Sequence, residues 1–81
     1  MLVYRVTRVG VGSENIESYM KAVSAFLTNV EVSSIPCILE EVNLDDNFKE
    51  KSSRVVMSCT VDDRGNKIIN KLGGNIYKCA Y

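Results

Sequence analysis

The stretch of residues 13–30, SENIESYMKAVSAFLTNV, constrains the fold of this chain more than any other feature. Its apolar side chains recur every three or four positions, at Ile16, Met20, Val23, Leu27 and Val30, and the same stripe is widened by Tyr19 and Phe26. This spacing is typical of an amphipathic helix that buries one face. Ser13 is a favourable N-cap residue, and Glu14 puts a negative charge in the first turn. The pattern therefore predicts a helix that begins at Ser13.

Alternating apolar and polar residues on either side of this helix predict strands. They alternate over residues 2–9, and again over residues 37–44, 54–61 and 75–81. Residues 62–74 begin with Asp, end with two glycines and carry apolar residues at helical spacing, which predicts a second, shorter helix. An alternative reads NKIIN, residues 66–70, as a strand, which would make the C-terminal half a meander.

The order strand, helix, strand, strand, helix, strand is that of the ferredoxin-like βαββαβ fold. It predicts an α+β protein in which two helices cover one face of a four-stranded antiparallel sheet. A length of 81 residues leaves room for one domain, residues 1–81. A domain of this size buries a small core, so association with a second copy or another protein is one way to gain stability.

The charge balance argues against binding to duplex DNA. Ten basic and ten acidic residues give a formal net charge of zero, whereas proteins that bind duplex DNA are commonly basic. No stretch reaches the roughly 20 apolar residues of a membrane span, and no signal peptide precedes the first strand. The cysteines, Cys37, Cys59 and Cys79, are odd in number and widely spaced, which indicates free thiols. We therefore expect a cytoplasmic protein without a membrane segment.

The residue types that carry most enzyme chemistry are missing or scattered. The chain has no histidine, which is the commonest general base and metal ligand. Its cysteines form no CxxC pair, so they predict neither a zinc site nor an activated nucleophile. The adjacent carboxylates Glu40 and Glu41 would point to opposite faces of a strand. We therefore expect no catalytic residues, no metal, no cofactor and no enzymatic activity.

The sequence RVTRVGVGSENIE, residues 5–17, joins the first strand to the predicted helix through two glycines. A glycine turn before a helix N-terminus can hold an anion, and the candidate anion turn consists of Gly10, Gly12 and Ser13. The loop VGVGS, residues 9–13, loosely resembles the phosphate loop of acylphosphatases, but the arginine with which that family grips phosphate does not follow it. We prefer a tight turn, and a small sensor of anionic ligands is the second alternative.

The sheet face turned away from the helices is the best candidate for a binding surface. Its outward residues would be Arg5, Thr7, Arg54, Ser58, Thr60, Tyr77 and Tyr81. Arginine beside tyrosine suits single-stranded RNA, because the ring stacks on bases and the guanidinium contacts phosphate. The central strands lack the outward aromatics of RNA-recognition motifs, so RNA binding is an alternative. A mixed apolar and polar face also fits association with a protein, or with a second copy in a homodimer.

The polar loop DDNFKEKSS, residues 45–53, carries one aromatic residue, Phe48. Such a side chain is either a small anchor for a partner or tucked under the loop. By elimination, we expect a small non-enzymatic regulator or inhibitor that acts by protein–protein association, of the kind that viruses use to modulate cellular macromolecules.

Overall fold

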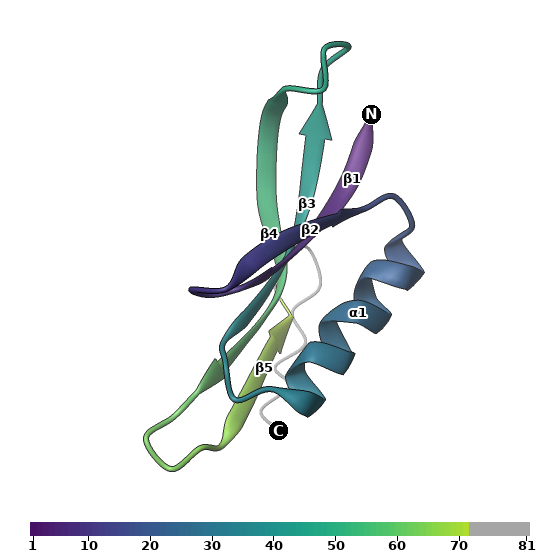
Figure 1. Cartoon of the computed structure of the whole chain (residues 1–81). Helices are drawn as coiled ribbons and strands as arrows, with labels where there is room; N and C mark the ends of the chain where they lie inside the picture. The colour runs from purple at the N-terminus through teal and green to yellow at the C-terminus, as the bar shows by residue number, and fades with distance from the viewer. Residues whose placement is uncertain (72–81) are drawn as a thin grey trace.

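A five-stranded antiparallel sheet is the largest element of the structure, in the order β2-β1-β3-β4-β5. The computed structural model describes residues 1–71. The elements are β1 (Leu2–Arg8), β2 (Gly12–Ile16), α1 (Tyr19–Val32), β3 (Cys37–Leu44), β4 (Glu50–Val61) and β5 (Lys67–Lys71). Figure 1 shows α1 along one side of the sheet and the β3–β4 hairpin extending beyond it. No helix in the described part of the chain has the length and apolar character needed to cross a membrane.

The ferredoxin-like βαββαβ prediction is wrong, because residues 1–71 contain one helix and five strands. Residues 13–16, expected to open the helix, lie in β2, which pairs with β1. Residues 67–71, expected in a second helix, form β5 and pair with the end of β4. The structure therefore has the meander that was the alternative for NKIIN. The strand expected at residues 75–81 lies outside the described residues.

A tight turn between β1 and β2 explains why the helix does not begin at Ser13. Gly10 has a φ of 80°, and the N–H of Val11 donates to the carbonyl of Arg8 at 2.9 Å. A positive φ at the third turn position is typical of a type II turn and suits glycine. The chain reverses there, so Ser13 pairs with Thr7 in the sheet. The N-cap of α1 is instead Ser18.

The core lies between α1 and the sheet. Ala22 and Phe26 are fully buried, and the strand residues that share their cluster are Val6, Cys37, Leu39, Met57 and Cys59. The helix covers β1 and β3 and reaches β2. Its buried face is centred on Phe26, at the edge of the predicted stripe, and also contains Ala22 and Val30. Two members of that stripe, Met20 and Leu27, remain 75% and 46% exposed.

A residue of β5 holds the C-terminal end of α1. The Nζ of Lys67 donates to the carbonyls of Val30 and Glu31. The last turn of α1 has no basic residue of its own, so Lys67 supplies the positive charge that stabilises a helix C-terminus. This contact ties β5 to α1, although the two elements are far apart in the sequence.

Candidate functional site

The structure brings part of the predicted binding surface together. Four residues of the predicted set lie on the face opposite α1, because each alternates along its strand with core residues. They are Arg5, Thr7, Ser58 and Thr60. Arg54 does not join them, because the register of β3 and β4 shifts between Leu39 and Glu40. Because of this irregularity, Arg54 is the cross-strand partner of Glu41. Glu41 is also the partner of Tyr4, whose side chain packs against the core, so Arg54 lies on the helix side of the sheet. Tyr77 and Tyr81 lie outside the described residues.

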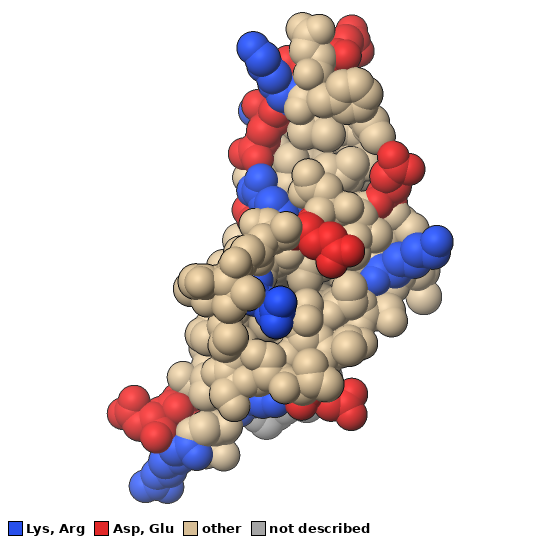
Figure 2. Space-filling view, in the orientation of Figure 1, with Lys and Arg blue, Asp and Glu red and all other residues tan. Residues whose placement is uncertain are grey.

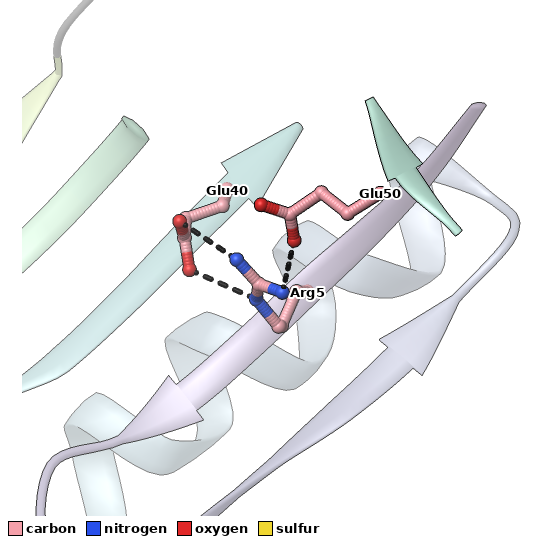
Figure 3. A network of polar contacts seen from close by, with 3 residues as sticks. All are labelled: Arg5, Glu40 and Glu50. Carbon is pink, nitrogen blue, oxygen red and sulfur yellow. Dashed lines mark hydrogen bonds and ion pairs between the residues drawn. The ribbon is translucent and has the colours of Figure 1, made fainter. Parts of the chain in front are cut away.

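Two glutamates engage Arg5, as Figure 3 shows. Its Nε and Nη2 donate to Oε1 and Oε2 of Glu40 at 3.0 and 3.1 Å, and its Nη1 donates to Oε1 of Glu50 at 2.8 Å. Arg5 and Glu40 are direct cross-strand partners, and Glu50 is the first residue of β4. The hydrogen bonds to Glu40 have the larger effect on the pKa of the Arg5 guanidinium and raise it, and the hydrogen bond to Glu50 raises it further. Arg5 therefore joins three strands.

This pairing changes the charge of the face opposite α1. One positive guanidinium meets two carboxylates, so the group formed by Arg5, Glu40 and Glu50 is negative. A phosphate would have to displace both carboxylates and would be repelled by them. Arg54 is also paired, with Glu41 at 3.3 Å. These contacts give little support to the RNA-binding alternative.

Arg5→Met is expected to lower the free energy of unfolding by about 1 kcal/mol, a value that allows for solvent screening at a partly exposed pair. The reason is that the carboxylate of Glu40, with a side chain only 19% exposed, would lose two hydrogen bonds that water replaces only in part. The matched control is Arg54→Met, because the Arg54 side chain is 63% exposed and its loss should cost less than about 0.5 kcal/mol. Urea unfolding at one ionic strength measures both, and equal costs would contradict a structural role for Arg5.

The predicted anion turn lacks the helix that motivated it. Gly10 lies in the turn between β1 and β2, and Gly12 and Ser13 lie within β2. Because α1 begins after Ser18, the backbone amides of a helix N-terminus do not converge on the glycines.

The thiols of Cys37 and Cys59 lie opposite each other on β3 and β4, where both are buried and free. Burial raises the pKa of each thiol, so both are protonated and unreactive at neutral pH. Within residues 1–71, no group of three or more His, Cys, Asp or Glu side chains could hold a metal ion. The two thiols therefore serve the packing of the core.

The β3–β4 hairpin ends in a turn, residues 45–49, that we call the hairpin tip (Figure 1). The N–H of Asp45 donates to the carbonyl of Lys49 at 2.8 Å, and the N–H of Phe48 donates to the carbonyl of Asp45 at 3.0 Å. Oδ1 of Asp45 accepts from the N–H groups of Asn47 and Lys49 at 2.8 and 2.9 Å. These four hydrogen bonds define the tip, and Phe48 on it is 69% exposed.

The same turn occurs again between β4 and β5, at residues 62–66. The N–H of Asp62 donates to the carbonyl of Asn66, and the N–H of Gly65 donates to the carbonyl of Asp62, both at 3.0 Å. Oδ1 of Asp62 accepts from the N–H groups of Arg64 and Asn66 at 2.9 and 2.8 Å. The fourth residue is left-handed in both turns, with a φ of 82° at Gly65 and 61° at Phe48. One turn therefore has phenylalanine where its twin has glycine.

Phe48 is both strained and exposed. A left-handed backbone costs an L-residue about 1–2 kcal/mol, and a side chain that is 69% exposed recovers little of this by packing. Residues held in such conformations concentrate at functional sites. The hairpin tip is therefore the strongest candidate for a functional site among residues 1–71.

Comparisons of this chain with protein families, with curated proteins and with solved structures found no match. The functional inference therefore rests on the residues of the chain itself, and above all on the conformation and exposure of Phe48.

Proposed function

We propose that this chain is a small non-enzymatic protein that acts by binding another protein, with Phe48 as the anchor of the contact. The observation that carries this proposal is an exposed phenylalanine at the left-handed position where the twin turn has Gly65. Such a side chain lowers the stability of the free protein and gains little from its own fold. A partner that buries the ring accounts for both features.

The chemistry of the hairpin tip suits an apolar pocket with a polar rim. The exposed neighbours of Phe48 are Asp46, Asn47 and Lys49, which mix both charges and suit the hydrated edge of an interface. The hydrogen bonds of the turn hold the backbone beneath the ring before binding, which lowers the entropy cost of association. Such a contact fits a regulator or inhibitor that docks one rigid tip into its target.

The proposal includes a cytoplasmic location. The free thiols of Cys37 and Cys59 support it, because reducing compartments keep thiols unpaired.

Phe48→Gly tests the proposal, because glycine removes the ring and suits the left-handed backbone. Tagged wild-type protein is expected to capture a stoichiometric partner from an extract of the native cells, and Phe48→Gly to capture about tenfold less or lower. The matched control is Val11→Ser, which removes a side chain that is 55% exposed in a different turn and should capture as the wild type does. Unchanged capture by Phe48→Gly would overturn the proposal, and a captured partner that nuclease removes would favour RNA binding.

A further inference from the structure

The hairpin that carries the tip is an irregular ladder. The register of β3 and β4 shifts between Leu39 and Glu40, and it shifts again between Asn43 and Leu44, just before the tip. Such irregularities disrupt the ladder locally, bend the bulged strand and increase its twist. Figure 1 shows that this part of the hairpin extends beyond α1. The direction of the tip therefore depends on side-chain contacts as well as on the backbone ladder.

One ion pair joins the start of β4 to β1, across β3. Nη1 of Arg5 donates to Oε1 of Glu50 at 2.8 Å, and Glu50 follows Phe48 by two residues. The other donors of the guanidinium, Nε and Nη2, bond to Glu40 of β3, which fixes the cation on the body of the sheet. In Figure 3 the two glutamates reach Arg5 from different strands. The pair therefore connects the residues next to the tip with the body of the sheet.

The Arg5–Glu50 ion pair requires a hairpin that bends toward Arg5. Arg5 is the cross-strand partner of Glu40, and Glu50 is the partner of Leu44. The four residues from Glu40 to Leu44 span about 13 Å along a strand, and two strand spacings add about 10 Å across the sheet. On a flat sheet this separation exceeds the reach of the two side chains, so the ladder must curve to bring them together.

The net charge of the hairpin does not account for this bend. Figure 2 shows Lys and Arg side chains interspersed with Asp and Glu over the hairpin end of the molecule. Charges of both signs largely cancel at a distance, so they do not draw the hairpin toward the sheet as a whole. A specific contact, such as the Arg5–Glu50 ion pair, is what can hold one direction.

We propose that Glu50 is a positioning residue, whose ion pair with Arg5 sets the direction in which the hairpin tip presents Phe48 to a partner. This inference rests on the proposed function and adds to it the residue that orients the anchor. A tip held in one direction keeps most molecules competent to bind, and apparent affinity falls in proportion when that fraction falls. The side chains of Arg5 and Glu50 are 27% and 43% exposed, so salt weakens their pair.

Residual dipolar couplings of the backbone amides of the full chain measure the direction of the tip. Glu50→Thr removes the carboxylate with a residue that suits a strand, and it is expected to change the couplings of residues 45–49 while those of β1 and β3 stay constant. Higher salt should move the wild-type couplings of the tip toward those of this variant. Circular dichroism verifies that the variant folds.

The matched control is Glu41→Thr. Glu41 forms its ion pair with Arg54, so this variant removes a carboxylate that joins β3 to β4 within the same hairpin. The couplings of the tip should remain those of the wild type. A change as large as that of Glu50→Thr would show that any lost charge on the hairpin moves the tip, which overturns the inference.

Capture from an extract of the native cells tests the consequence for binding. Glu50→Thr is expected to capture about two- to fivefold less partner, the change in population that an exposed ion pair supports, and Glu41→Thr to capture as the wild type does. Tip couplings that Glu50→Thr leaves unchanged overturn the inference. Unchanged capture by Glu50→Thr also overturns it, while lost capture by Phe48→Gly leaves the proposed function standing. Unchanged capture by Phe48→Gly overturns the proposed function, and with it the role of Glu50 in binding.

Discussion

Phe26→Ala is expected to lower the free energy of unfolding by about 3–5 kcal/mol. Phe26 is 0% exposed and belongs to the cluster that joins α1 to the sheet. Its loss leaves a cavity that the neighbouring side chains fill only in part. The net stability of a domain of this length is roughly 4–12 kcal/mol, at about 0.05–0.15 kcal/mol per residue. The variant therefore loses a large share of its stability, which urea unfolding followed by circular dichroism measures.

The chain supplies its own control for this substitution, since it contains two phenylalanines. Phe48→Ala removes the same atoms from a side chain that is 69% exposed, and should change the free energy of unfolding by less than about 0.5 kcal/mol. Similar costs for the two variants would contradict the position of the core.

The elements that the sequence predicts best are those with a strong local pattern. The alternation of residues 2–9 and 37–44 corresponds to β1 and β3, and that of residues 54–61 to the longer part of β4. The expected loop at residues 45–53 is too long, because β4 already begins at Glu50. The helix exists where its apolar spacing indicates, although it begins after Ser18 rather than at Ser13. The periodicity agrees with burial at Val6, Leu39 and Met57, whereas Met20 and Leu27 of the helical stripe remain exposed.

The predictions of secondary structure are wrong where one local sequence pattern is compatible with two kinds of element. Ile16 fits the helical stripe, yet it also fits a strand, and its pairing with Tyr4 in β1 decides between them. Asp62 is a good helix cap, but the same side chain can instead bond to the amides of a turn, as it does with Arg64 and Asn66. Both choices depend on contacts with another strand, which a local pattern does not contain.

The candidate site was predictable only in outline. Phe48 is visible in the sequence as a lone aromatic in a polar loop, and the structure shows it exposed. Its left-handed backbone was not predictable, because phenylalanine does not favour that conformation. A usable signal was the pair Asp-Asp at residues 45–46 and 62–63, which opens both turns. The engagement of Arg5 by Glu40 depends on the register of β1 and β3, which the sequence leaves open.

Substitutions at the left-handed positions of the twin turns, Phe48 and Gly65, are expected to move stability in opposite directions. Phe48→Gly should raise the free energy of unfolding by about 1 kcal/mol, because relief of the left-handed strain exceeds the entropy that glycine adds to the unfolded chain. Gly65→Ala should lower it by about 1 kcal/mol or more for the converse reason. A Cβ at Gly65 would meet no atom within 4 Å, so this cost comes from the backbone alone. Urea unfolding measures both changes.

Gly12→Ala is the matched control for the substitution at Gly65. A Cβ at Gly12 also meets nothing within 4 Å, but the φ of Gly12 lies outside the left-handed region. Alanine there should leave stability unchanged or raise it by about 0.4–1 kcal/mol. A cost equal to that of Gly65→Ala would show that the loss does not come from the sign of φ.

The sign of the change at Phe48 bears directly on the binding proposal. If Phe48→Gly destabilises the chain, packing of the ring outweighs the strain, and Phe48 is a structural residue. The observation on which the proposal depends would then be lost. If the variant is more stable and captures less partner, the chain keeps phenylalanine although glycine would fold better. A residue retained against the stability of its own fold is what a binding anchor requires, because its ring is buried only when the partner is present.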